Sequence, residues 1–136
     1  MSHKIIRSIY EQRLAAWATG QGLRVAYQNV SFEPAGDETY LAAFTLPAGT
    51  DSNTLAGDHK LYTGLFQVNV VTPAGNGPGT AESLVDDLAS LFPIYLRLSQ
   101  GDFTVTVMTP VDPGTGIVGD TTYSVPASFQ YRADTE

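Results

Sequence analysis

Apolar residues recur with helical spacing in two segments of the chain. In residues 3–19 the apolar side chains that fall near one helical face are Ile6, Ile9, Tyr10, Leu14 and Trp17. In residues 80–92 the corresponding stripe consists of Ala81, Leu84, Val85, Leu88, Leu91 and Phe92. Spacings of three and four residues are typical of a helix that packs one face against a core. Both segments are therefore predicted to be amphipathic helices.

Alternation of apolar and polar residues predicts strands in other parts of the chain. The strand-like segments are residues 23–30, 39–46, 61–71, 94–99, 102–109 and 121–134. Turn residues between the first two segments predict that these two form a hairpin or meander. Pro126 has no backbone N–H to donate, so the strand that contains it is expected to lie at an edge of the sheet or to bulge there.

The order of these elements predicts a single α+β domain over residues 1–136. We expect two helices packed on one face of a largely antiparallel or mixed sheet of about four to six strands. Residues 47–60 contain almost nothing that could pack, and they are predicted to form a long exposed loop. Residues 111–120 are rich in turn residues and are predicted to form a second excursion.

Three glycines precede the second predicted helix, an order that also begins many nucleotide-binding sites. The spacing Gly75-x-Gly77-x-Gly79 departs from the dinucleotide fingerprint, and no lysine follows to complete a P-loop. Pro78 also removes one amide that a phosphate nest would use. We therefore expect these glycines to form a turn, with Thr80 capping the helix through its hydroxyl.

Composition restricts the classes of partner. Fourteen acidic residues against seven basic ones give a net charge of −7, and the basic residues are scattered, which argues against a surface that grips nucleic acid. The chain has no cysteine, which excludes disulfides and thiolate metal sites and fits a reducing cytoplasm. No apolar run approaches the roughly 18 residues of a membrane span, so a membrane partner is not expected.

Candidate catalytic chemistry is sparse. His59 lies beside Asp58 in the predicted loop, and His3 lies at what is expected to be a frayed N-terminus. Asp86 and Asp87 are adjacent on a helix, where their side chains diverge by about 100°. Aromatic residues on the strands could stack nucleic-acid bases, but the acidic balance argues against this. We expect no catalytic residue, no metal and no cofactor, and the protein is predicted not to be an enzyme.

The sequence resembles the phage tail terminator-like proteins, a family related to the terminator of lambda-like siphophages. The likeness covers most of the chain and is strongest in three stretches, namely "YQNVSFEPAGDETYLAAF", "YTGLFQVNVVTPAGNGPGTAESLVDDLASLF" and "VPASFQYRAD". The positions that carry it are Asn29, Phe32, Pro34, Tyr40, Tyr62, Gly64, Gln67, Pro73, Gly75, Gly77 and Phe92.

This resemblance implies a structural protein of the virion that forms a ring, usually a hexamer, on the head-proximal end of the tail tube. Such a ring stops polymerisation of the tube protein and presents a joining surface to the head–tail connector or stopper protein. Its partners would be further copies of itself, the tube protein and the connector. Genome DNA would pass through its lumen without sequence-specific binding. The expected location is the virion tail and neck, and the host cytoplasm during assembly.

The two predicted excursions are the candidate ring or tube interfaces. Their candidate residues are Thr50, Asp51, Asn53, Leu55, Asp58, His59 and Lys60 in the first, and Asp112, Thr115, Ile117 and Asp120 in the second. The main alternative is another neck-region ring protein, such as a head-completion or connector-stopper protein. Two further alternatives are a small hydrolase that uses His59 with Asp58, and a single-stranded nucleic-acid binder.

Overall fold

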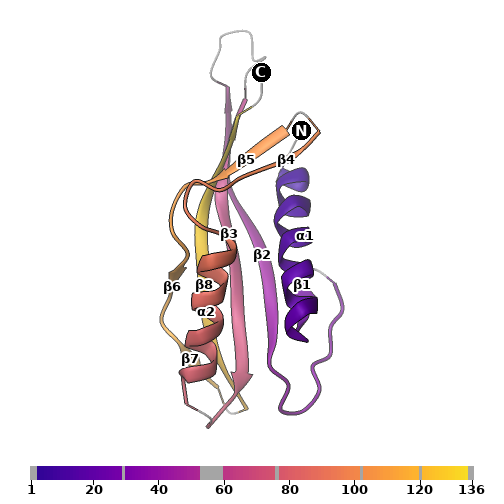
Figure 1. Ribbon diagram of the computed structural model, residues 1–136, viewed down its shortest axis with the longest axis vertical. Coiled ribbons are helices and arrows are strands. Elements are labelled where there is room, and N and C mark those ends of the chain that lie inside the picture. The colour runs from indigo at the N-terminus through magenta and orange to yellow at the C-terminus, as the bar shows by residue number, and fades with distance from the viewer. Residues whose placement is uncertain are drawn as a thin grey trace.

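The described part of the chain forms two helices and eight strands. The structure, a computed structural model, describes residues 3–28, 30–52, 60–75, 77–101, 103–119 and 121–134. In chain order the elements are α1 (His3–Gln21), β1 (Arg24–Tyr27), β2 (Tyr40–Ser52), β3 (Lys60–Pro73), α2 (Gly79–Leu91), β4 (Arg97–Gln100), β5 (Phe103–Val107), β6 (Asp112–Pro113), β7 (Ile117–Val118) and β8 (Thr122–Asp134). Figure 1 shows an elongated molecule in which three long strands run along the longest axis.

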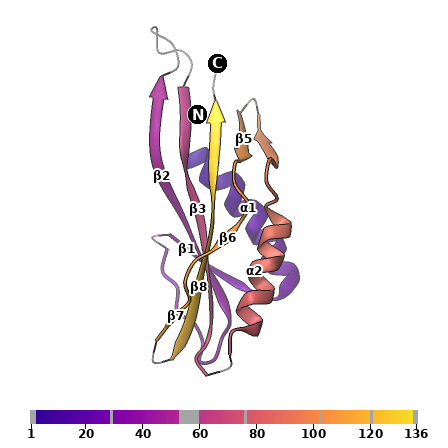
Figure 2. The same ribbon diagram turned by 90° about the vertical axis from the view of Figure 1, so that its left-hand side faces the viewer.

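The sheet is larger than predicted and it curls. It is a mixed sheet with the order β1-β2-β3-β8-β5-β4, and β6 and β7 also pair with β8. The prediction of an α+β fold with two helices on a sheet of four to six strands is therefore wrong, because the sheet has eight strands and curls into a half-barrel along the helices (Figure 2). Two of these strands lie in the segment that was predicted to be an excursion. The right-handed twist of strands up to 14 residues long accumulates into the curl.

β1 and β2 are parallel, so the predicted hairpin between them is wrong. The register pairs Arg24 with Tyr40 and Tyr27 with Ala43. The connection over residues 28–39 is long enough to return the chain to the end of the sheet from which β1 started. Arg24 stabilises this connection: its guanidinium lies 4.5 Å from the centre of the Phe32 ring. The Phe32 ring in turn packs on Tyr40, with 5.0 Å between ring centres.

Arg24 also forms an ion pair with Glu38, which favours the ionised form of the Glu38 carboxyl. Arg24 Nη2 lies 2.6 Å from Glu38 Oε1, and Arg24 Nε donates to Glu38 Oε2 at 2.7 Å. The Arg24 hydrogen bond, together with the Ala35 amide, lowers the pKa of Glu38 from 4.5 to about 2. A lowered folded-state pKa stabilises the fold above the unfolded-state pKa, and that contribution is lost as the pH falls from about 4.5 to about 2.

We expect Arg24→Gln to raise the pKa of Glu38 towards 4.5, because the first cause of the shift is removed. An NMR titration of the Glu38 carboxyl carbon between pH 2 and 6 measures it. Arg132→Gln is the matched control, because Arg132 is also exposed but pairs with Asp134. An unchanged Glu38 midpoint in Arg24→Gln would show that the ion pair does not set this pKa.

β8 is a central strand, which corrects the expectation that Pro126 places it at an edge. It pairs with β3 over its whole length, from Thr122 to Asp134. On its other side it pairs in turn with β7, β6 and β5. Pro126 lies between the residues of β8 that pair with β7 and those that pair with β6. Its missing N–H therefore interrupts neither of these two ladders. Its carbonyl accepts a hydrogen bond from the Gly114 amide at 2.6 Å.

The core lies between the sheet and the two helices, and the alternation in the sequence is confirmed. Every second residue is buried in β3 from Tyr62, in β5, and in β8 from Val125, including Phe66, Val105 and Phe129. Both predicted helical stripes face this layer, although Trp17 of the α1 stripe is only half-buried. α1 buries Ile6, Ile9, Tyr10, Leu14 and Ala18, and α2 buries Ala81, Val85 and Leu88. Figure 2 shows both helices along the same face of the sheet. The bounds of both helices agree with the prediction to within two residues.

The glycines before α2 serve a turn, as predicted. Gly75 and Gly77 have φ angles of 90° and 76°, in the region that favours glycine. The predicted cap is wrong, however, because α2 begins at Gly79 with Pro78 as its N-cap and no side-chain cap bond. Proline suits the start of a helix since the N–H that it lacks would have no partner there. Thr80 lies inside the first turn instead.

Candidate functional site

Within the segment predicted to be the first loop, residues 47–52 and 60 extend the long hairpin. β2 continues to Ser52 and β3 begins at Lys60, with Thr50 paired to Tyr62 and Asp51 paired to Leu61. Thr50, Asp51 and Lys60 therefore lie on strands at the end of the hairpin. The sequence of 47–60 looked unable to pack, but strand pairing is supplied by backbone groups and needs no apolar side chain. The candidate residues Asn53, Leu55, Asp58 and His59 lie outside the described residues.

Thr50 belongs to a polar cluster that the sequence did not predict. His3 Nε2 lies 3.0 Å from Thr50 Oγ1, and His3 Nδ1 lies 2.7 Å from the hydroxyl of Tyr131. The His3 ring also meets Tyr62 edge-on, with 5.2 Å between ring centres. His3 was predicted to lie at a frayed end, but it joins α1 to β2, β3 and β8. Only the tertiary fold brings these four residues together, so local sequence patterns contain no signal for the cluster.

Gly64 makes room for this cluster. A Cβ on Gly64 would collide with the hydroxyl of Tyr131 and would lie 2.7 Å from the carbonyl oxygen of Leu46. The ring of Tyr131 thus crosses β3 at the only kind of residue that leaves space for it. Burial raises the pKa of Tyr131 to about 12, so its hydroxyl stays protonated and needs a hydrogen-bond partner, which His3 provides.

We expect His3→Ala to lower the free energy of unfolding by about 1–2 kcal/mol, because the Tyr131 hydroxyl loses its partner in a partly buried site. Urea denaturation at neutral pH measures this change. Lys4→Ala is the control, since Lys4 is the neighbouring residue of α1 and is exposed. Equal stabilities of the two variants would show that the cluster contributes nothing to the fold.

The second predicted excursion is held on the edge of the sheet. Asp112 lies in β6 and Ile117 in β7, and both short strands pair with β8. Asp112, Thr115 and Ile117 are exposed, whereas Asp120 lies outside the described residues. Gly116 packs directly under the ring of Tyr123, where a Cβ would collide with that ring. The segment is therefore a fixed, exposed rim, and the structure confirms its exposure.

The two predicted surfaces do not meet. The strand ends with Thr50 and Lys60 lie at one end of the long axis, while β6 and β7 lie along one side and towards the other end (Figure 1). They cannot form one binding site within a single chain. The two surfaces are therefore separate from each other.

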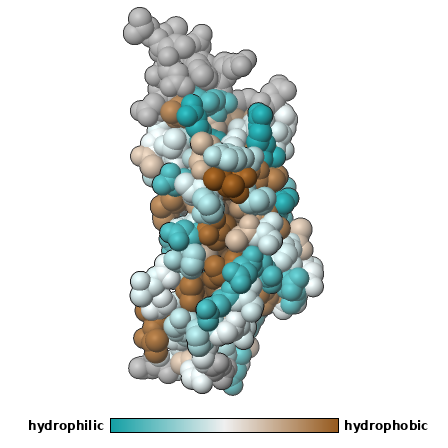
Figure 3. Space-filling view, turned by 60° about the vertical axis from the view of Figure 1, so that its left-hand side comes forward, coloured by the Kyte–Doolittle hydropathy of each residue, from teal (hydrophilic) through white to brown (hydrophobic). Residues whose placement is uncertain are grey.

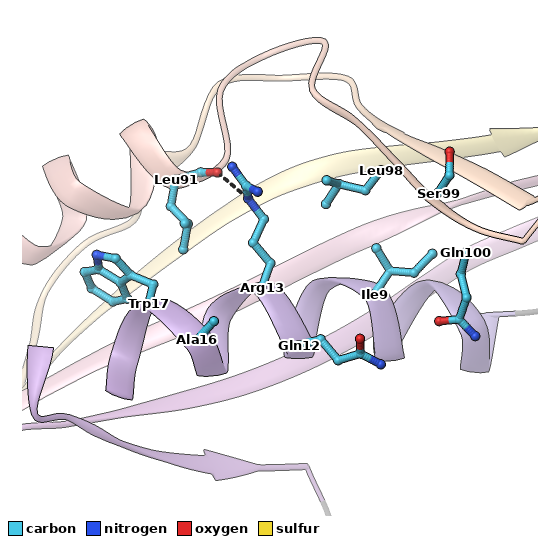
Figure 4. A pocket seen from close by; sticks show the side chains of 9 residues that line it. All are labelled: Ile9, Gln12, Arg13, Ala16, Trp17, Leu91, Leu98, Ser99 and Gln100. Carbon is cyan, nitrogen blue, oxygen red and sulfur yellow. Dashed lines mark hydrogen bonds between the residues drawn. The ribbon is translucent and has the colours of Figure 1, made fainter. Parts of the chain in front are cut away.

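A groove between α1, the end of α2 and β4 is a third surface, which the sequence did not predict (Figure 4). Its volume is about 710 Å³, and the residues that line it are Ile9, Gln12, Arg13, Ala16, Trp17, Leu91, Leu98, Ser99 and Gln100. Arg13 Nε donates to the carbonyl oxygen of Leu91 at 2.8 Å, where it meets the partial negative charge of the α2 C-terminus. Arg13 lies outside the apolar stripe of α1, and nothing in the local sequence indicates that β4 folds across that side of the helix.

Among the described residues there is no group of three or more histidine, cysteine or acidic side chains that could hold a metal ion. Within that same part of the chain, no helix is both long and apolar enough to cross a membrane.

Comparison with known proteins gives one family and several solved structures. The family described as "Phage tail terminator protein" matches residues 5–131. A solved structure that is 42% identical in sequence superposes with a TM-score of 0.83, over 98% of this chain and 96% of that one. No curated protein matches the chain.

Proposed function

Because this chain belongs to the phage tail terminator family, we propose that it forms a ring on the head-proximal end of the tail tube, stops polymerisation of the tube protein and provides the surface that joins the head. The family is a structural one of the phage tail, and its members interact with tail components. A structural role in the tail and a location in the virion tail follow from that membership. The match over residues 5–131 is the observation that carries the proposal.

The shape of the subunit supports a ring. A closed ring of identical subunits needs two unlike surfaces on each copy, one that meets the preceding copy and one that meets the next. The groove beside α1 and the rim formed by β6 and β7 are unlike in chemistry, and in Figure 1 α1 and β6 lie on opposite sides of α2. The end of the β2–β3 hairpin then remains for a tube or connector contact. We propose a hexamer that assembles in the host cytoplasm.

The net charge of −7 is consistent with a lumen through which DNA passes without being held. The proposed partners are further copies of the chain, the tube protein and the head–tail connector or stopper protein. No specific observation favours the alternative of a different neck-region ring protein, which remains an outcome that the experiment below distinguishes.

The test is to add the purified protein to growing tail tubes and to image the tubes by negative-stain electron microscopy. We expect a ring at one end of each tube and an arrest of elongation, with light scattering giving the number of copies. Binding to tail-less heads while tubes continue to grow would instead support the neck-protein alternative. Deletion of residues 53–59 tests the hairpin as the tube contact, because capping that survives this deletion would remove it.

A further inference from the structure

The groove beside α1 contains a cation without a carboxylate partner. Only the Nε of Arg13 is engaged, by the carbonyl oxygen of Leu91, and no carboxylate lies within ion-pair distance of Arg13 in the described ranges. Figure 4 shows its guanidinium beside the Leu91 carbonyl, at the end of α2 that faces α1. A guanidinium has five N–H donors arranged to receive a carboxylate, so most of its binding capacity is unused here.

The walls of the groove are mainly apolar. Ile9, Trp17 and Leu98 contribute large apolar side chains to it, while Gln12 and Gln100 form its polar rim. Its volume of about 710 Å³ lies within the range of pockets that enclose a ligand or several side chains. An occupant that fits this chemistry carries a carboxylate next to exposed apolar side chains.

The chain itself has such a segment, on the other side of α2. Ile117 and Val118 of β7 are 64% and 75% exposed, which is unusual for two adjacent large apolar residues. Asp112 of β6 is exposed, and within the described part of the chain it has no ion pair. In Figure 3 apolar side chains reach the surface at the end of the molecule where β7 runs. The rim therefore presents a carboxylate and an apolar pair.

In the groove and on the rim, the charged residue and the apolar residues follow the same order along the long axis of the molecule. α1 runs from the hairpin end towards the β7 end, so Arg13 lies nearer the hairpin than Trp17 does (Figure 1). On the rim, Asp112 pairs with Ser128 and Ile117 with Ser124, so the carboxylate is likewise nearer the hairpin end. Two copies placed side by side with parallel long axes thus bring cation to carboxylate and apolar side chain to apolar side chain.

We propose that the α1 groove of one copy receives the β6–β7 rim of the next, with the Asp112 carboxylate on the Arg13 guanidinium and with Ile117 and Val118 against the Trp17 end of the groove. This inference rests on the proposed ring and specifies its subunit interface. The contact joins two unlike surfaces, so it propagates from copy to copy and closes into a ring instead of stopping at a dimer. The opposite charges orient the copies, and the apolar side chains supply the buried area.

Charge reversal tests the pair. We expect Arg13→Glu and Asp112→Arg each to weaken ring formation at least about tenfold, because each places like charges against each other. The double variant restores ring formation. An equimolar mixture of the two single variants also restores it, since alternating copies then form one native pair and one reversed pair at successive contacts. Sedimentation velocity across a concentration series, in the presence of tube ends if the free protein is monomeric, measures assembly.

Two controls distinguish loss of the contact from a general effect of charge and from loss of the fold. Asp86→Arg makes the same charge change on the exposed side of α2, outside the proposed contact, and is expected to assemble like the unmodified protein. Asp112 is exposed on the rim, so Asp112→Arg retains the fold even if Arg13→Glu, which loses the Leu91 hydrogen bond, does not. Circular dichroism checks the fold of each variant.

Cross-linking gives a second readout. The chain has no cysteine, so the double variant Ala16→Cys and Val118→Cys introduces a single pair, with one thiol in the groove and one on the rim. Mild oxidation is expected to produce a ladder of covalent oligomers that ends at the ring size, while each single variant remains uncross-linked. The single tryptophan, Trp17, lies in the groove, and its fluorescence should shift when rings form.

The outcomes separate this inference from the proposed function. Rings that form in Asp112→Arg as they do in the unmodified protein, or that yield no cross-linked ladder, would overturn the interface while leaving the terminator role intact. An unmodified protein that neither forms rings nor binds tube ends would overturn the terminator role, and the interface with it.

Discussion

Replacing Tyr10 by alanine is expected to lower the free energy of unfolding by about 3–5 kcal/mol, the range for large aromatic truncations in a core. Tyr10 is fully buried and its ring is the centre of an aromatic cluster. Its centre lies 5.3 Å from that of Phe66, 5.8 Å from Phe92 and 5.1 Å from Phe129. Truncation removes all of these contacts at once and leaves a cavity between α1 and the sheet.

Tyr10→Phe is the matched variant, and we expect it to raise the free energy of unfolding instead of lowering it. The Tyr10 hydroxyl is buried and has no hydrogen-bond partner among the residues that the structure describes. Burial raises the pKa of this hydroxyl well above its ordinary value, so it remains neutral and gains nothing from ionising. Removing an unpaired buried polar atom is expected to stabilise the fold by about 1 kcal/mol. Guanidinium denaturation of the three proteins measures both changes. A phenylalanine variant as unstable as the alanine variant would show that the hydroxyl, and not the ring, holds the cluster together.

Gly64→Ala is expected to cost about 3 kcal/mol, at the upper end of the range for overpacking a core. The new methyl group would collide with the Tyr131 ring and would lie 2.7 Å from the Leu46 carbonyl oxygen. That oxygen belongs to the neighbouring strand and cannot move without disturbing the pairing of Leu46 with Leu65. The hydroxyl of Tyr131 would also be pushed away from His3.

Gly49→Ala is the matched control for this prediction. Gly49 lies in β2, in the same strand pair, but no atom lies within 4 Å of the position that its Cβ would take. Gly49 follows the register shift in β2, but its φ lies outside the left-handed region that favours glycine. We therefore expect the unfolding free energy of this variant to stay within about 0.5 kcal/mol of that of the unmodified protein. Thermal denaturation of the two alanine variants separates them. Similar melting temperatures would show that the strands adjust to the extra methyl group at Gly64.

The helices and the faces of the strands followed from the sequence because they depend on local periodicity. The stripe with Ile6 and Leu14 could face only one way once α1 formed, and the alternation through Phe66 and Phe129 fixed the buried side of β3 and β8. Pairing partners could not be predicted in this way. Parallel pairing of β1 with β2 depends on a connection stabilised by Arg24 and Glu38, which are separated by 14 residues and show no periodic pattern.

In the candidate interfaces, too, the features that depend on local sequence could be predicted and those that depend on the tertiary fold could not. Exposure of the rim around Asp112 and Ile117 was predicted from turn residues, which act locally. The groove was missed because Arg13 and Leu98 come from elements far apart in the chain, and only the sheet order places β4 across α1. The hairpin was taken for a loop because its end pairs through backbone groups, which side-chain patterns do not report.

The position of β8 in the sheet has a consequence for when the protein can fold. This strand is the last of the sheet in chain order, yet it pairs with β3 along its full length and also with β5, β6 and β7. Phe66 meets Phe129 across the ladder, although 63 residues separate them (129 − 66). Contacts between such distant parts of the chain slow folding, because the loop must close before they form. During synthesis on the ribosome, the apolar face of the β2–β3 hairpin and of both helices therefore stays exposed until β8 emerges. Native subunits become available for assembly only after synthesis has passed this strand.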